Sequence, residues 1–128
     1  MKAVHRIRLS QADAHYGGGL IAGGRIMELF GDVATEICVR HDGDEGLLAG
    51  YSSVEFLAPV YAGDFLEVVG EIVTVGNSSR EVSLSAYRYV RPRPDVNDSA
   101  ADLLAEPEPV ARATGTVVVK QDRRRPPT

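Results

Sequence analysis

The sequence predicts an α+β fold in which one long helix packs against one antiparallel sheet. A helical repeat of apolar residues spans residues 24–40 without a proline, and stretches of strand character joined mostly by short turns follow it. Short turns suit antiparallel strands, because parallel strands need a crossover of a dozen or more residues. A helix with one apolar face must be covered, and a curved sheet wrapped around it is the simplest cover.

The first part of the chain combines a strand, a glycine-rich loop and the helix. Residues 2–9 alternate weakly between apolar and polar and predict an edge strand. Residues 10–24 hold glycines at 17–19 and 23–24, which is typical of a loop that bends sharply or approaches another group closely. The apolar residues of the following helix lie on one broad face, formed by Ile26, Leu29, Phe30, Val33, Ala34 and Ile37.

Strands account for most of the remaining chain. They are predicted at residues 47–57, 65–75, 79–90 and 110–120, between turn signals. A long connection separates the last two, and a short helix is expected within it at residues 99–105. Together with the edge strand, this predicts a sheet of five or six strands. Residues 1–121 are expected to form a single domain, and residues 122–128, which are charged and rich in proline, a disordered tail.

Composition limits the kinds of partner. The chain has 128 residues and a formal net charge of −4, so a nucleic-acid partner, which needs a basic footprint, is not expected. No stretch approaches the roughly 20 apolar residues of a membrane span, and the N-terminus lacks the apolar region of a secretory signal. The single cysteine, Cys38, excludes an intramolecular disulfide. We therefore expect a cytoplasmic protein without membrane contact.

Six motifs in chain order carry a resemblance to a known family. They are DAHYGGGLIAGGRI (13–26), GDVATE (31–36), DGDEGLLAGY (42–51), EFLAPVYAGDFLE (55–67), VGNSS (75–79) and EPEPVARATG (106–115). Together they cover nearly the whole chain except the tail and resemble the β-alanyl-CoA:ammonia lyase and 3-aminobutyryl-CoA ammonia lyase family of hotdog-fold proteins. The run from Phe56 through Pro59 and Val60 to Asp64 also resembles the strand junction of hotdog acyl-CoA thioesterases.

The resemblance implies a hotdog fold and reversible loss of ammonia from a short β-aminoacyl-CoA. The stretch DGDEGLLAGY favours 3-aminobutyryl-CoA, converted to crotonyl-CoA as in lysine fermentation. CoA enters as part of the substrate and no cofactor is implied. A homodimer is implied as the minimum unit, with a higher homo-oligomer such as a hexamer and a site at the subunit interface. No metal is expected, because the three histidines share no ligand spacing.

Elimination of ammonia β to a thioester needs a base for the α-proton and donors for the enolate-like oxygen. The donors are expected in the glycine-rich loop, where backbone N–H groups and the positive end of the helix can approach a carbonyl closely. The candidates are Gly18, Gly19, Gly23 and Gly24, with Tyr16 beside them as a substrate contact. The alternative is that these glycines serve only a turn.

Asp32 is the first candidate for the base. Glu28, Asp32 and Glu36 recur every four residues opposite the apolar face, and like charges at this spacing repel and raise one another's pKa. Hotdog thioesterases with two glycines before the helix carry an aspartate where this chain has Gly31. Asp32 is rotated by about 100° from that place, which argues against a thioesterase mechanism. We expect Glu36 to act as the partner of Asp32. The alternative is that the whole stripe is only a solvated helix face.

Further candidates lie outside the helix. Asp13 resembles a loop aspartate of other hotdog thioesterases, and His15 can shuttle a proton near neutral pH, with hydrogen bonding inside the loop as the alternative. Glu55 is a candidate for the subunit interface and for contact with the substrate or CoA there. Asn77 and Arg80 are candidates for binding the CoA phosphates, followed by Arg88, Arg91 and Arg93.

Two other functions stay open at this point. An acyl-CoA thioesterase would use Asp32 or Asp13 to activate water and would release the CoA thiol, which the lyase does not. A non-catalytic acyl-CoA-binding hotdog domain would bind its ligand without turnover, and its carboxylates would tolerate replacement by amides.

Overall fold

The structure is a computed structural model that describes residues 1–126. Its strands are β1 (Lys2–Arg8), β2 (Leu47–Phe56), β3 (Phe65–Val75), β4 (Ser79–Pro92) and β5 (Ala101–Val118), and its long helix is α1 (Gly23–Asp42). Three short 3-10 helices complete the described part of the chain, namely η1 (Gln11–Asp13), η2 (Gly17–Gly19) and η3 (Gln121–Arg123).

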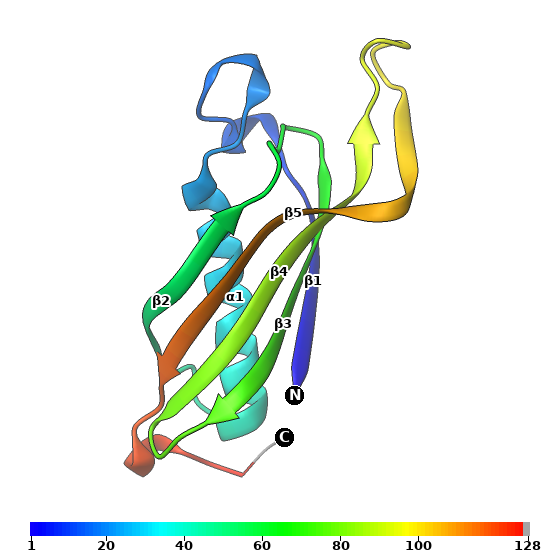
Figure 1. Ribbon diagram of the computed structural model, residues 1–128. Coiled ribbons are helices and arrows are strands. Elements are labelled where there is room, and N and C mark those ends of the chain that lie inside the picture. The colour runs from blue at the N-terminus through cyan, green and yellow to red at the C-terminus, as the bar shows by residue number, and fades with distance from the viewer. Residues whose placement is uncertain (127–128) are drawn as a thin grey trace.

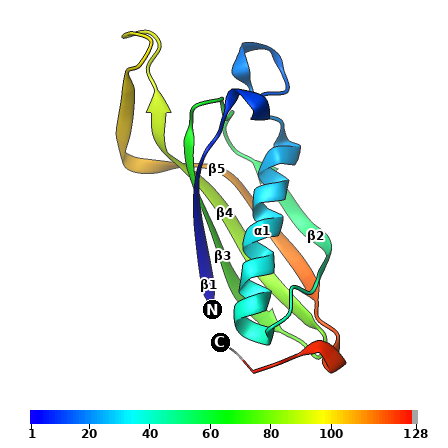
Figure 2. The same cartoon turned by 180° about the vertical axis from the view of Figure 1, so that it is seen from behind.

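The strands of the described region form one antiparallel sheet in the order β1-β3-β4-β5-β2. The consecutive strands β3, β4 and β5 pair as neighbours, and β1 and β2 close the two edges. The sheet curves around α1, which lies along one face of it (Figures 1 and 2). The predicted hotdog arrangement is therefore confirmed, with five strands in the sheet.

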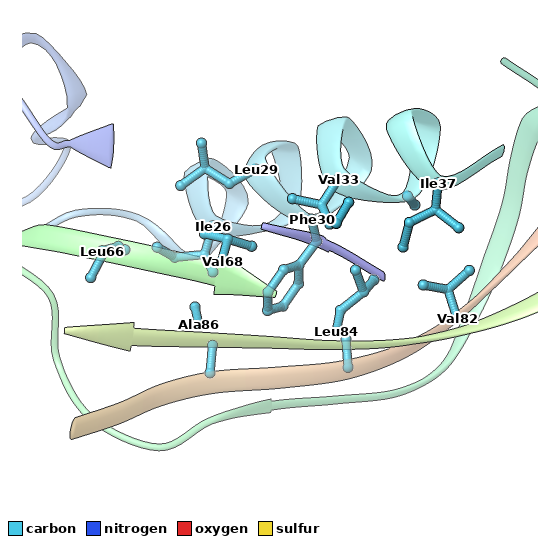
Figure 3. Close-up of a cluster of buried hydrophobic side chains, with 14 of the residues drawn as sticks. Ile26, Leu29, Phe30, Val33, Ile37, Leu66, Val68, Val82, Leu84 and Ala86 are labelled. Carbon is cyan, nitrogen blue, oxygen red and sulfur yellow. The ribbon is translucent and has the colours of Figure 1, made fainter. Parts of the chain in front are cut away.

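The core lies between α1 and the inner face of β3 and β4. Figure 3 shows Phe30, Val33 and their neighbours on α1 pointing toward the strands. The facing side chains are Leu66, Val68, Val82, Leu84 and Ala86, all fully buried. Gly70 permits the close packing, because a Cβ there would lie 2.7 Å from Cγ1 of Val33. Burial of each large apolar side chain contributes about 1.5–3 kcal/mol, which fixes α1 on the sheet.

The C-terminal end of α1 is fastened to the β3–β4 turn by a buried ion pair. Arg80 donates from Nε to Oδ2 of Asp42 at 2.8 Å and from Nη2 to Oδ1 at 2.9 Å. Its Nη1 donates to the carbonyl oxygens of Gly76 and Ser79. Gly43 then ends the helix in the left-handed conformation, with φ at 65°.

The connection between β4 and β5 differs from the prediction. Residues 101–103 pair with the end of β4, with Leu103 opposite Val90, so the short helix predicted at residues 99–105 is wrong. Cross-strand pairing satisfies this backbone and overrides its local helix propensity. The turn is stiffened by Arg93, which donates to Asp95 and Asp102. The resulting hairpin projects beyond the body of the sheet (Figure 1).

The chain after β5 passes the end of α1. The backbone N–H of Arg125 donates to the carbonyl of Asp42 at 2.7 Å, and its guanidinium donates to the carbonyl of Gly43. Residues 122–126 thus follow a defined path where the sequence predicted disorder, and residues 127–128 of the predicted tail lie outside the described residues. Between residues 1 and 126, no helix has the length and apolar character needed to cross a membrane.

Candidate active site

A cavity of about 420 Å³ opens at the N-terminal end of α1. Its walls come from the loop before α1, the first turn of α1 and the segment that follows β2. The lining includes Tyr16, Ile21, Gly23, Ile26, Phe56 and Leu57, and none of the described residues that line it is charged. The cavity therefore suits an apolar group of acyl-chain size placed against the start of a helix.

The start of α1 is shaped for close approach. A Cβ on Gly23 would lie 2.6 Å from Cζ of Phe56, so any larger residue at this position would require the phenylalanine ring to move. The preceding residue, Ala22, offers no side-chain acceptor to the first turn. The N–H groups of a first turn lack partners within the helix and lie at its positive end. This end of the cavity can thus receive a developing negative charge on oxygen.

The glycine-rich loop is pinned against the segment after β2. Gly18 and Gly19 have φ values of 71° and 77°, a conformation that costs other residues roughly 1–2 kcal/mol. The N–H of Ala62 donates to the carbonyl of Gly19 at 2.9 Å, and the N–H of Ile21 donates to the carbonyl of Val60 at 2.8 Å. Gly18 and Gly19 therefore serve the turn. A Cβ on Gly24, by contrast, would meet nothing within 4 Å.

Asp13 organises the loop. Its Oδ2 accepts from the backbone N–H of Ser10 and its Oδ1 accepts from Nε of Arg25, both at 2.8 Å. The hydrogen bond from Ser10, and then Arg25, lower the pKa of Asp13, so this carboxylate is a cap and a poor proton acceptor. His15 is exposed and lies edge-on to the ring of Tyr16 at 4.7 Å. The predicted catalytic roles of Asp13 and His15 find no support in these contacts.

Asp32 and Glu36 have different surroundings on α1. Asp32 is exposed and lies nine residues after Gly23, roughly 13 Å along the helix axis at 1.5 Å per residue. Glu36 contacts Nε2 of His5 and accepts from Nε of Arg40, each at 2.9 Å. These two partners lower the pKa of Glu36, with His5 the larger cause. The predicted mutual raising of pKa along the stripe is therefore wrong for Glu36.

Glu55 lies outside the cavity. It accepts hydrogen bonds from Nε and Nη2 of Arg112, both at 3.1 Å, in an exposed pair that lowers its pKa. Because side chains alternate along a strand and Phe56 meets α1, Glu55 belongs to the sheet face turned away from the helix. Its predicted role at the subunit interface stays a prediction.

The two leading candidates for binding the CoA phosphates lie far from this cavity, whereas Arg88 and Arg91 line a second cavity. Asn77 and Arg80 belong to the β3–β4 turn, beside the C-terminal end of α1, and the 20-residue helix is about 30 Å long. Arg80 is 2% exposed and its donors are occupied by Asp42 and two carbonyls. The prediction that Arg80 binds phosphate is wrong, because the side chain is a structural clamp.

Arg88 was predicted only as a further candidate for binding the CoA phosphates, and the polar cluster built around it was missed. This arginine is 6% exposed and contacts Asp64 and Glu108, next to a second cavity. The pattern of β4 could have indicated that Arg88 is buried, because residue 88 continues the inward-facing series of Val82, Leu84 and Ala86. A charge at an inward position requires a buried partner. Within residues 1–126, no group of three or more His, Cys, Asp or Glu side chains is placed to hold a metal ion.

Known proteins share this fold and much of this sequence. Residues 18–91 match the Thioesterase superfamily. 3-Aminobutyryl-CoA ammonia lyase from Acetoanaerobium sticklandii is 54% identical over 125 residues, which span 98% of this chain and 99% of the relative. The structure of beta-alanyl-CoA:ammonia lyase from Clostridium propionicum matches with a TM-score of 0.95 and 39% identity, over 100% of this chain and 91% of that one.

A more distant structure shows the fold alone. The hexameric hotdog fold thioesterase of Campylobacter jejuni matches with a TM-score of 0.76 and 23% identity, over 97% of this chain and 88% of that chain. Both the sequence and the structural likeness are much stronger to the ammonia lyases. The chain therefore belongs to the Thioesterase superfamily and, within it, to the family of hotdog-fold β-aminoacyl-CoA ammonia lyases.

Proposed function

We propose that this protein catalyses the reversible elimination of ammonia from a short β-aminoacyl-CoA, converting 3-aminobutyryl-CoA to crotonyl-CoA. The observation that carries the proposal is 54% identity over almost the full length of both chains to 3-aminobutyryl-CoA ammonia lyase. The superfamily's name describes its fold relatives, whereas the lyases are the proteins that this chain matches end to end. CoA takes part only as the carrier of the acyl group, and the reaction uses no further cofactor.

The apolar cavity supports this reaction by its shape and position. The acyl chain occupies the space beside Ile26 and Phe56, and the thioester oxygen points to the first turn of α1 at Gly23. Each well-placed donor to an enolate-like oxygen contributes about 3–4 kcal/mol to the transition state. The cavity wall thereby stabilises the negative charge that develops when the α-proton is removed.

The proton and electron movements balance without a redox step. A base takes the proton from Cα, and the electron pair of that C–H bond moves toward the thioester oxygen. The Cα–Cβ double bond then forms as the C–N bond breaks, and the nitrogen leaves as ammonia, which takes up a proton to become ammonium. The reverse reaction adds ammonia to the β-carbon of the enoyl thioester.

A homo-oligomer supplies the missing base. The cavity has an uncharged lining in the described residues, and Asp32 lies about 13 Å away along its own helix. We place Asp32 of a neighbouring subunit at the cavity mouth, which requires at least a dimer and is compatible with a hexamer. Tyr16 and Phe56 at the mouth are 57% and 56% exposed, and a neighbouring subunit would cover these rings. We also propose that the protein is located in the cytoplasm.

Incubation with 3-aminobutyryl-CoA tests the proposal. The lyase is expected to produce the absorbance of an enoyl thioester without releasing a thiol to a thiol-reactive dye. Thiol release without enoyl absorbance would replace the proposal with a thioesterase. Tight acyl-CoA binding with neither signal would favour a non-catalytic binding domain.

A further inference from the structure

A second cavity, of about 490 Å³, shares Pro59 with the first and has a polar wall. Gly18 and Tyr61 line one part of it, and Arg88, Arg91 and Glu108 line another. The glycine-rich loop borders both cavities, because Tyr16 lines the first and Gly18 lines the second. A small group that leaves the acyl chain at the first cavity therefore has polar surroundings close by.

The polar wall is built on a fixed ion pair. Nη1 of Arg88 donates to Oδ2 of Asp64 at 2.9 Å and to the carbonyl oxygen of Pro59 at 2.8 Å. Asp64 also accepts from the backbone N–H of Tyr61 at 2.8 Å. Arg88 and Asp64 are 6% and 2% exposed, so both side chains are held in place by the fold.

Glu108 is the accessible member of the cluster. Nη2 of Arg88 donates to its Oε2 at 2.6 Å, while the Glu108 side chain keeps 40% of its surface exposed at the cavity. Its Oε1 accepts no hydrogen bond from the described residues, and the buried Nε of Arg88 likewise has no acceptor among them. The cluster therefore leaves one accessible acceptor, Oε1 of Glu108, and one buried donor, Nε of Arg88, open to a ligand or to water.

The charge of the cluster favours a cationic ligand. Two carboxylates, Asp64 and Glu108, share the single positive charge of Arg88, which leaves one negative charge on the group. A carboxylate oxygen that a guanidinium positions and leaves open is a suitable acceptor for an N–H donor carrying positive charge. Arg91, which is exposed at the same cavity, and the unpaired Nε of Arg88 are the groups among the described lining residues that would instead favour an anion or another acceptor.

We infer that Glu108 binds the substrate's ammonium group and receives the ammonia that leaves, which makes it a specificity-determining residue for amino over unsubstituted acyl groups. This inference rests on the proposed lyase function and extends it to a residue that was not among the candidates named from the sequence. Arg88 and Asp64 are positioning residues, since Arg88 holds Glu108 and Asp64 holds Arg88.

The test is steady-state kinetics of the purified full-length protein in the addition direction, with crotonyl-CoA and ammonium varied separately. Glu108→Gln keeps the size of the side chain and removes its charge. The KM for ammonium is expected to rise about tenfold or more, the loss typical of a charged hydrogen bond. The KM for crotonyl-CoA is expected to stay within about twofold, since the enoyl thioester has no ammonium group.

Two further variants sharpen the test. Glu106→Gln is the matched control, because Glu106 is exposed on the same strand two residues away and has no hydrogen bond to the described residues. It is expected to leave both KM values unchanged. Glu108→Asp keeps the charge and is expected to raise the ammonium KM less than Glu108→Gln does, and it carries the test where the amide variant fails to fold.

The possible results separate the inference from the proposed function. Wild-type protein without ammonium-dependent activity would overturn the lyase and this inference with it. Active wild type together with an unchanged ammonium KM in folded Glu108→Gln would overturn the inference alone. Tighter binding of CoA by Glu108→Gln, at an unchanged ammonium KM, would also overturn it and assign the cavity to an anion held by Arg91.

Discussion

Asp42 and Glu36 illustrate how neighbouring cations decide what a carboxylate can do. The hydrogen bonds from Arg80 lower the pKa of Asp42, and His5 with Arg40 lowers that of Glu36. Both groups stay anionic near neutral pH and bind protons poorly. Asp32 and Glu28 have no ion pair with the described residues and lie exposed on α1, so these two carboxylates of the stripe remain free for proton transfer, and Asp32 is the one we expect to act as the base.

Replacement of Asp32 tests this assignment. Asp32→Asn is expected to lower kcat by about 10²- to 10⁴-fold, the range for loss of a general base. The melting temperature should change little, because the side chain is exposed. Glu36→Gln is the comparison on the same stripe and should keep most of its activity. Full turnover in Asp32→Asn would show that another group takes the α-proton.

The clamp between Asp42 and Arg80 is expected to contribute to stability in a pH-dependent way. Asp42→Asn leaves the buried guanidinium unpaired and should lower the free energy of unfolding at pH 7 by about 3–5 kcal/mol. Because the folded pKa of Asp42 lies below the unfolded value of about 4, this stabilisation is present above pH 4. It is lost as pH falls through the folded pKa.

Urea unfolding of wild type and Asp42→Asn, measured from pH 7 down to pH 3, checks both parts of this expectation. The difference between the two proteins should shrink toward the acid end. Glu55→Gln, which breaks the exposed pair with Arg112, is the control and should unfold at nearly the wild-type urea concentration. A constant difference at all pH values would contradict the role given to the Asp42 carboxylate.

At the scale of the element, the start of α1 is the part of the fold that we propose binds the thioester oxygen. Gly23→Ala would place a methyl group 2.6 Å from Cζ of Phe56, so the ring and the cavity wall must shift. We expect the loss of kcat/KM, expressed as a free energy, to exceed the loss in the free energy of unfolding. Gly24→Ala is the matched control, because its Cβ meets nothing within 4 Å.

Enzyme kinetics and thermal melting of the Gly23→Ala and Gly24→Ala variants distinguish the roles of the two glycines. Gly24→Ala should keep the fold and gain up to about 1 kcal/mol of stability, because alanine favours a helix over glycine. If Gly23→Ala were as active as wild type, the contact between the helix start and Phe56 would not shape the site.

Helices and strands could be predicted from the sequence where a local pattern of apolar residues determines them. The strand predicted at residues 65–75 coincides with β3, and the helix predicted at 24–40 lies within α1. The extension of β5 could not be predicted, because residues 101–103 become a strand only by pairing with β4. Likewise, the periodicity of β4 places Arg80 and Arg88 inward, but their carboxylate partners lie 38 and 24 residues away, beyond any local signal.

At the scale of the whole molecule, the proposed site requires two subunits. The cavity near Gly23 and the Asp32 proposed to act at it come from different copies of the chain. Gly23→Val blocks the cavity and Asp32→Asn removes the base, so each variant alone is expected to be inactive. A mixed oligomer restores one complete site in each heterodimer, which gives about a quarter of the wild-type activity for random pairing of equal amounts.

Activity assays after coexpression of the two variants check this expectation. Recovery of activity in the mixture, and not in either variant alone, supports a site shared between subunits. Absence of recovery in a mixture shown to contain heterodimers would place the base and the cavity in the same chain.

The measurement that tests the central claim most directly is the absorbance of crotonyl-CoA incubated with the purified protein, with and without ammonium. If the protein is a lyase, the enoyl absorbance falls only when ammonium is present and no CoA thiol is released. The product is then heavier than crotonyl-CoA by one molecule of ammonia. Loss of the thioester with thiol release in the absence of ammonium would contradict it.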